Sequence, residues 1–143
     1  MIRLVRLGLV ASLALPLSGC LFDSALYAIE GRGHSIAVNR DQNWFWQDTV
    51  NLYLIASRLP DCQESLRIEG VPRRTAIVIH RPPSVYAEPI HIAEVNQVYY
   101  AVSTVSCRVQ RFGSRPDDLG ERVGSFKELP DGHFDFVAEK AVR

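Results

Sequence analysis

The ten residues Thr49-Val50-Asn51-Leu52-Tyr53-Leu54-Ile55-Ala56-Ser57-Arg58 decide the fold class of this chain. Side chains alternate between the two faces of an extended strand. One face would carry Val50, Leu52, Leu54 and Ala56. Because Tyr53 and Ile55 are apolar and lie on the opposite face, we predict a central strand over 49–58 that is covered on both sides. A helix is the main alternative, because several of these residues also fit one helical face.

Further strands are predicted on both sides of this one. Residues 75–80 are rich in β-branched side chains, which favour a buried strand. Shorter strands are predicted at 65–68 and 90–95, a long one at 97–111, and a loop at 111–124. Residues 126–129 and 133–138 flank Pro130-Asp131-Gly132 and read as a hairpin. The pattern predicts an all-β fold, a small antiparallel β-sandwich or barrel of about six or seven strands.

Both tryptophans of the chain, Trp44 and Trp46, lie just before the predicted central strand. If its alternation continues toward the N-terminus, they share the face of Leu52 and Leu54, so we expect them in or at the edge of the core. The alternative is an exposed aromatic patch, in which Trp44 and Trp46 would be binding residues for a partner or a glycan.

The first twenty residues, MIRLVRLGLVASLALPLSGC, have the layout of a secretory signal peptide. Two arginines precede the apolar run 7–17, which is about half the roughly 20 residues that a membrane-spanning helix needs. The run ends in Leu17-Ser18-Gly19-Cys20, which resembles the lipobox of bacterial lipoproteins. The resemblance implies cleavage before Cys20, a diacylglycerol on its sulfur and an acyl chain on its new amino group.

The same resemblance implies a location and a partner. Two acyl chains suffice for stable membrane anchoring. Leu21 follows Cys20 where an aspartate would favour retention at the inner membrane. We therefore expect the protein on the periplasmic face of the outer membrane, held by its lipid anchor. No cofactor is expected other than the covalent acyl groups of Cys20.

The expected organisation has four parts. Residues 1–19 are the cleaved signal peptide, 20–33 the anchor and a short helix or linker, 34–138 the β-domain, and 139–143 a C-terminal tail. The helix is predicted because apolar side chains fall on one helical stripe. These are Leu21, Phe22, Ala25, Leu26 and Ile29.

The charge balance argues against a nucleic-acid partner. Without Arg3 and Arg6 of the leader, 14 basic residues face 16 acidic ones. A nearly neutral protein lacks the basic surface that binds polyanions. Export from the cytoplasm argues in the same direction.

The three cysteines are Cys20, Cys62 and Cys107. If Cys20 is lipidated, an even pair remains in an oxidising compartment, and we expect a Cys62–Cys107 disulfide. A two-cysteine metal site and a reactive thiol are the alternatives. Neither cysteine belongs to a C-x-x-C pair, which makes both alternatives less favoured.

Motifs that could carry chemistry are weak, and we predict neither catalytic nor metal-binding residues. Gly33-His34-Ser35-Ile36-Ala37 looks like the nucleophile elbow of α/β-hydrolases, but no βαβ pattern surrounds it. His80 and His91 could approach each other at a hairpin end, with Glu88 as a third ligand; we expect them to be solvated instead. Asp117-Asp118 lacks the spacing of a calcium loop.

A modest basic patch is predicted around residues 108–115. It consists of Arg108, Arg111 and Arg115. This patch could contact anionic headgroups or lipid A phosphates, and it is otherwise an ordinary charged edge.

These observations predict an anchored, non-catalytic protein. The first hypothesis is an adaptor or assembly factor that binds a periplasmic protein through a sheet edge or loops. The alternative is a binding module for a small ligand, a lipid or a glycan, which would use an aromatic patch around Trp44 and Trp46.

Overall fold

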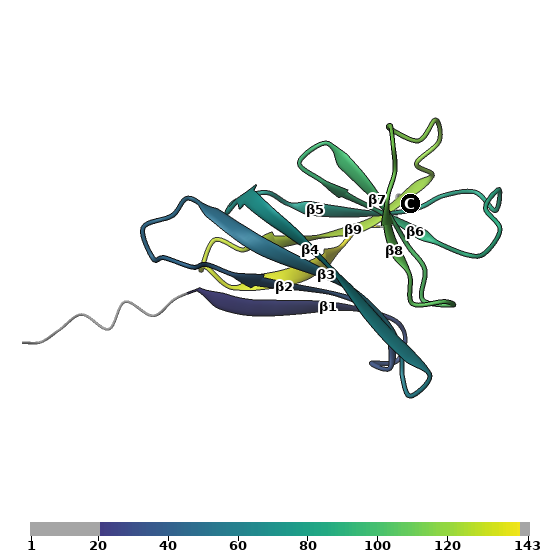
Figure 1. The fold of residues 1–143 in the computed structure, drawn as a ribbon, viewed down its shortest axis with the longest axis horizontal. Coiled ribbons are helices and arrows are strands. Elements are labelled where there is room, and N and C mark those ends of the chain that lie inside the picture. Colours follow the sequence, from purple (N-terminus) through teal and green to yellow (C-terminus); the bar gives the residue numbers. More distant parts are fainter. Residues whose placement is uncertain (1–20, 141–143) are drawn as a thin grey trace, which may run out of the picture.

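The computed structural model describes residues 21–140, which form two antiparallel sheets packed against each other (Figure 1). The first sheet has the order β1-β2-β3-β4, with strands Phe22–Glu30, His34–Asp41, Thr49–Arg58 and Cys62–Pro72. The second has the order β10-β9-β5-β6-β7-β8. Its strands are β5 Ile77–Arg81, β6 His91–Val95, β7 Val98–Val102, β8 Val109–Arg111, β9 Glu121–Glu128 and β10 Phe134–Ala138. The predicted leader, Cys20 and the end of the tail lie outside the described residues.

The all-β prediction is confirmed, whereas the number of strands was predicted too low. Strand β3 has the predicted bounds and lies between β2 and β4. Leu52, Leu54 and Ala56 are buried and pack in one core between the sheets. The second sheet contributes Ile77, Ile79, Ala93, Val95, Val102 and Phe126 to that core. Residues 21–140 form ten strands instead of six or seven.

The prediction of a short N-terminal helix is wrong, because Phe22–Glu30 is strand β1. It pairs with β2 from Phe22 opposite Asp41 to Ala28 opposite Ser35. Pairing with β2 supplies backbone hydrogen bonds and buries Ala25, and this tertiary gain outweighs the local helical pattern.

The predicted long strand over 97–111 is also wrong. It is divided into β7 and β8 by a loop at 103–108. The Ser103 hydroxyl oxygen accepts the backbone N–H groups of Val105 and Ser106, and Cys107 has a positive φ of 54°. Serine side chains that bond nearby backbone groups compete with a sheet ladder in this way. In contrast, β9 begins at Glu121, inside the predicted 111–124 loop.

The predicted disulfide is confirmed. Cys62 begins β4 and Cys107 lies in the β7–β8 loop, with their α-carbons 5.9 Å apart. The bond therefore joins the two facing sheets. Beside it, Nε of Arg58 in β3 donates to the Thr104 carbonyl at 2.9 Å. The β7–β8 loop is thus attached to the first sheet at two points.

At the other end of the domain, the sheets are joined by Arg40, whose side chain is 1% exposed. Its Nε and Nη2 donate to the two carboxylate oxygens of Asp23 at 2.8 and 2.7 Å. Nη1 donates to the Arg73 carbonyl at 3.0 Å, and Nη2 lies 3.4 Å from Glu128 Oε2. The guanidinium also lies 4.0 Å from the ring centroid of Phe134. One side chain of β2 therefore contacts β1, β9, β10 and the chain after β4.

Replacement of either Cys62 or Cys107 by serine is expected to lower the free energy of unfolding by about 2–4 kcal/mol, because the crosslink restricts the unfolded chain. Urea unfolding of the single and double variants measures this. The double variant should be no less stable than either single one. A thiol titration of the denatured, unreduced protein that finds both cysteines free would contradict the pairing.

Arg40→Met is expected to cost about 3 kcal/mol of unfolding free energy, because it removes one partner of a buried ion pair and leaves the Asp23 and Glu128 carboxylates without it. The matched control is Arg67→Met. Arg67 is exposed and pairs with exposed Glu69, and such pairs contribute about 0–1 kcal/mol. Urea unfolding measures both variants. An equal loss of unfolding free energy for the two would show that the buried Arg40 ion pair contributes no more to stability than an exposed one.

Candidate functional site: an aromatic tip and a distal pocket

The loop between β2 and β3 presents three consecutive aromatic side chains to solvent. Trp44, Phe45 and Trp46 are 56%, 58% and 64% exposed. The two indole rings stack with centroids 5.1 Å apart, and Phe45 meets Trp46 edge-on at 5.0 Å. The expectation that the tryptophans lie in or at the edge of the core is wrong, because β3 begins at Thr49 and its alternation does not extend through the loop. We call residues 43–47 the aromatic tip.

The base of the aromatic tip is closed by polar contacts. Gln42, which is buried, donates from Nε2 to the carbonyls of Gln47 and Thr49 at 2.7 and 3.3 Å. The Gln47 N–H donates to the Trp44 carbonyl at 3.1 Å. On the β4 side, the Arg73 N–H donates to the Asp48 carbonyl at 2.8 Å. The rings are therefore displayed on a loop whose two ends are held by hydrogen bonds.

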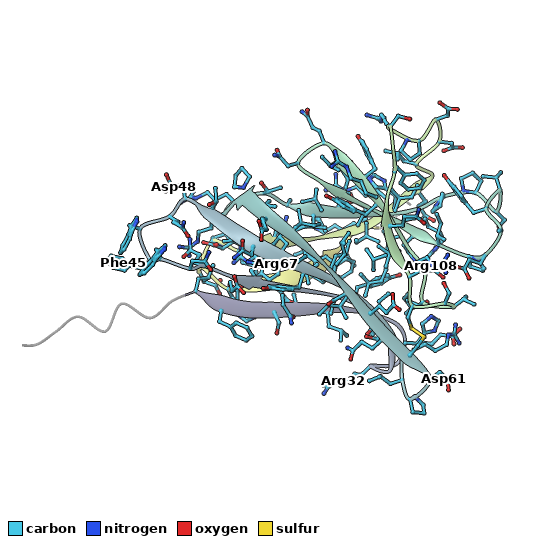
Figure 2. The ribbon with its side chains drawn as sticks, viewed as in Figure 1. Arg32, Phe45, Asp48, Asp61, Arg67 and Arg108 are labelled. Atoms are coloured by element: carbon cyan, nitrogen blue, oxygen red, sulfur yellow. A yellow bond between two sulfur atoms is a disulfide. The ribbon has the colours of Figure 1, made fainter. Side chains whose placement is uncertain are left out.

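The aromatic tip lies at the end of the domain where the described chain begins. The Gln42 N–H donates to the carbonyl of Leu21, the first described residue, at 3.2 Å. Phe22, which is 75% exposed, pairs with Asp41 at the base of the loop. Figure 1 shows the β2–β3 loop and the start of β1 together at one end of the long axis. In Figure 2, Phe45 projects outward from this end.

A groove of about 570 Å³ lies beside the aromatic tip. It is lined by Phe45, Trp46, Gln47, Asp48, Pro72, Arg73, Arg74 and Glu128. The groove is open and has charges of both signs, so it lacks the deep apolar shape that holds a small ligand.

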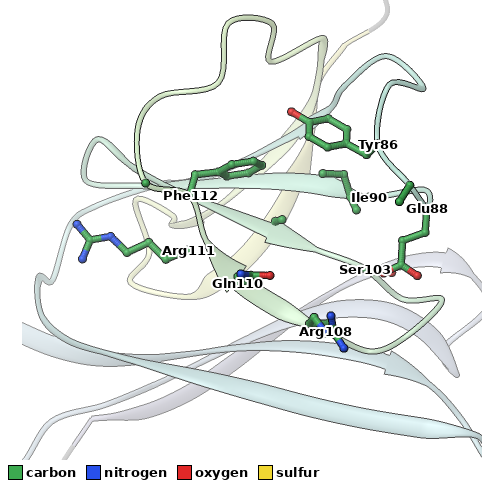
Figure 3. A pocket seen from close by; sticks show the side chains of 11 residues that line it. Tyr86, Glu88, Ile90, Ser103, Arg108, Gln110, Arg111 and Phe112 are labelled. Atoms are coloured by element: carbon green, nitrogen blue, oxygen red, sulfur yellow. The ribbon is translucent and has the colours of Figure 1, made fainter.

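A second candidate site lies on the second sheet (Figure 3), beside the β5–β6 loop, which Figure 1 shows at the opposite end of the long axis from the β2–β3 loop. It is a depression of about 420 Å³ between the β5–β6 loop and β8. Its lining is Tyr86, Ala87, Glu88, Ile90, Ala101, Ser103, Arg108, Gln110, Arg111, Phe112 and Gly113. We call it the distal pocket. Sequence reasoning missed it, because its aromatic residues are single residues in loops that show no periodic pattern.

The walls of the distal pocket are ordered by specific contacts. The rings of Tyr86 and Phe112 meet at an angle with centroids 6.1 Å apart. The Ser106 hydroxyl donates to Glu88 Oε1 at 2.6 Å, which joins the β5–β6 loop to the β7–β8 loop. Strand β8, which supplies Gln110 and Arg111, is an edge strand of its sheet. Two of the three arginines of the predicted basic patch, Arg108 and Arg111, line this pocket, and Arg115 lies over the Tyr99 ring.

The histidines do not come together in the way a metal site requires. His80 Nε2 lies 3.2 Å from Glu94 Oε2, while the His91 ring meets Tyr27 of the first sheet. Their rings therefore face opposite sides of the second sheet. Burial, with smaller effects of Arg81 and His34, lowers the pKa of His91 to about 4, so its imidazole is neutral at neutral pH. Within residues 21–140, no group of three His, Cys, Asp or Glu side chains is arranged to hold a metal ion.

The other residues considered for chemistry in the sequence, Ser35, Glu88 and Asp118, form hydrogen bonds within the fold. Ser35 is buried, and its hydroxyl donates to the Arg32 carbonyl at 3.1 Å. Glu88 is engaged by Ser106 and lies away from the His80–Glu94 pair. Asp118 accepts the Gly120 N–H at 2.8 Å and so stabilises a turn.

No protein-family model matches the chain, and no curated protein or solved structure is detectably similar to it. The part of the chain that the structure describes contains no helix long and apolar enough to cross a membrane.

Trp46→Ala is expected to change the free energy of unfolding by less than about 1 kcal/mol, because the side chain is mostly in water, where substitutions have small effects. Phe126→Ala is the matched control. Phe126 is fully buried, and its truncation should cost about 3–5 kcal/mol. Urea unfolding compares the two. A loss of several kcal/mol for Trp46→Ala would place the ring in the core after all.

Proposed function

We propose that the protein is an outer-membrane lipoprotein that acts as a non-catalytic adaptor, and that it holds an extended segment of a periplasmic protein at the distal pocket. The observation that carries this proposal is the position of that pocket. It opens between the β5–β6 loop and the edge strand β8. The β5–β6 loop lies at the opposite end of the long axis from the start of β1 (Figure 1).

The anchor is proposed from the lipobox-like sequence Leu17-Ser18-Gly19-Cys20. Cys20 directly precedes Leu21, whose carbonyl is bonded to the folded domain. A residue spans at most about 3.6 Å of chain. An acylated Cys20 would therefore hold the domain against the membrane surface, with the distal pocket directed into the periplasm.

The chemistry of the distal pocket suits a protein segment. Tyr86, Phe112 and Ile90 provide apolar wall, and Arg108 and Gln110 are exposed at its rim. Aromatic residues and arginine are enriched at protein interfaces and their hot spots. The free edge of β8 can accept an added strand through main-chain hydrogen bonds, while the pocket takes a side chain.

The pocket is also ordered before a partner binds. The Cys62–Cys107 disulfide and the Arg58–Thr104 bond fix the loop that forms one wall. A wall that is already ordered loses little conformational entropy on binding.

The alternative of a glycan or small-ligand module at Trp44 and Trp46 is less favoured. The two indoles stack on each other with an interplanar angle of 16°, so each covers one face of the other. The adjacent groove is open and charged. The exposed rings are better explained by contact with an extended surface.

Cys20→Ala tests the anchor. It is expected to abolish palmitate labelling and to release the protein from the outer membrane, because cleavage and acylation both need the cysteine. Ser18→Ala, which keeps a small residue, is the matched control and should behave as wild type. Outer-membrane fractionation of labelled cells measures both. Unchanged labelling and partitioning of Cys20→Ala would show that the lipobox interpretation is wrong.

Photocrosslinking in intact cells tests the adaptor role. A photoreactive amino acid at Gln110 or Tyr86 is expected to give one discrete protein adduct, and the same residue at exposed Arg67 in β4 should give none. Adding Arg108→Glu to the Gln110 variant should weaken the adduct at unchanged protein level. Adducts of equal yield at position 67, or none at either pocket position, would contradict binding at the distal pocket.

A further inference from the structure

We propose that the aromatic tip docks into the interfacial region of the same phospholipid bilayer that holds the anchor, so that the domain stands on the membrane at two points. The inference rests on the proposed lipidation of Cys20. It adds a second, non-covalent membrane contact made by Trp44, Phe45 and Trp46.

The composition of the aromatic tip matches a membrane interface. Tryptophan has a large apolar ring with one polar N–H, and it is enriched where membranes meet water. Three adjacent aromatic side chains that are each more than half exposed form a concentrated apolar surface. Phe22 adds a fourth ring at the same end of the domain. Soluble domains seldom leave such a surface uncovered.

The position of the aromatic tip identifies the bilayer as the surface that covers it. The loop base bonds the carbonyl of Leu21, one residue after the proposed acylated cysteine. The β2–β3 loop and the beginning of β1 share one end of the long axis, and the β5–β6 loop, which lines the distal pocket, lies at the other (Figure 1). Acyl chains inserted at residue 20 would therefore bring the tip to the headgroup layer.

Hydrogen bonds at the base of the aromatic tip order the loop before it contacts a membrane. Gln42 holds both ends of the loop, and the adjacent Arg40 is fixed by its bonds to Asp23, Arg73 and Glu128. The rings are thus presented on an ordered support. Insertion then orders few additional groups, which lowers its entropic cost.

The charges around the aromatic tip favour contact with phospholipid in general over contact with anionic lipid alone. Exposed Arg74 lines the adjacent groove and could bond a lipid phosphate. Arg73 is engaged by Glu128 at 3.3 Å, and Asp48 lines the same groove. With both signs present, we expect docking to depend on the aromatic rings and to change little with salt.

The two tryptophans make a direct test available, because they are the only ones in the 143-residue chain and both belong to the tip. The lipidated mature protein, residues 20–143, is reconstituted into phosphatidylcholine vesicles whose acyl chains are brominated, and into unbrominated vesicles. We expect its tryptophan emission in unbrominated vesicles to be blue-shifted relative to that of water-exposed tryptophan. Brominated chains should quench most of that emission, and added salt should change neither result.

Phe45→Asp is expected to red-shift the emission and to remove most of the quenching, because a carboxylate resists insertion. The matched control is Val85→Asp in the β5–β6 loop at the distal end, where the side chain is 77% exposed. It should leave the spectrum unchanged. The wild-type measurement needs no variant, so the test stands even if Phe45→Asp folds poorly.

Flotation of the vesicles separates the two proposals. Protein that floats with quenched tryptophans supports docking. Protein that floats with unquenched, water-like emission overturns docking and leaves the anchor intact. The aromatic tip would then be a binding surface for a protein or a glycan. Protein that does not float overturns the anchor and the docking together.

Discussion

The buried guanidinium of Arg40 fixes how the two sheets meet at one end of the domain. Taking a charge out of water is costly, and here the cost is offset by two bonds to Asp23, a bond to the Arg73 carbonyl, and Glu128. These partners come from β1, β9 and the chain after β4, so the guanidinium is satisfied only when these segments lie together. Removal of Arg40 alone would leave the Asp23 and Glu128 carboxylates unpaired, whereas replacement of all three side chains by well-packed apolar residues could be as stabilising. The main effect of the ion-paired group is therefore on the relative position of the sheets.

The position of Arg40 in β2 also affects the aromatic tip, because the two are close in the chain. Gln42 follows Arg40 by two residues, and its side chain holds both ends of the loop that carries Trp44 and Trp46. The opposite end is held differently, by the Cys62–Cys107 bond and by Arg58 on the Thr104 carbonyl. At each end of the sandwich, side-chain bonds join the two sheets and order a nearby surface. At one end this surface is the aromatic tip, and at the other it is the distal pocket, which has both apolar and charged residues. This arrangement suits a protein that contacts a membrane at one end and a partner at the other.

The sequence predicted the parts of the fold that depend on burial on both faces of a strand, such as 49–58, and the disulfide that followed from counting cysteines. It did not predict β1, because the spacing of Ala25, Leu26 and Ile29 fits a helix until the edge of β2 is known. It also placed Trp44 and Trp46 in or at the edge of the core, since alternation cannot show where a strand begins. The buried Arg40 and the distal pocket were missed because both depend on residues far apart in the chain, such as Asp23 with Glu128, or Tyr86 with Phe112.

Anchoring at Cys20 and docking of the aromatic tip predict an orientation, with the aromatic tip at the bilayer and the distal pocket away from it. Single spin labels at Asn43→Cys and at Val85→Cys, in the lipidated protein on vesicles, measure this orientation by collision with oxygen and with a water-soluble nickel chelate. The label at position 43 should be reached by oxygen and shielded from the chelate, and the label at position 85 should be open to the chelate. Equal access of the chelate to both labels would show that the domain is not oriented on the membrane and would contradict the account.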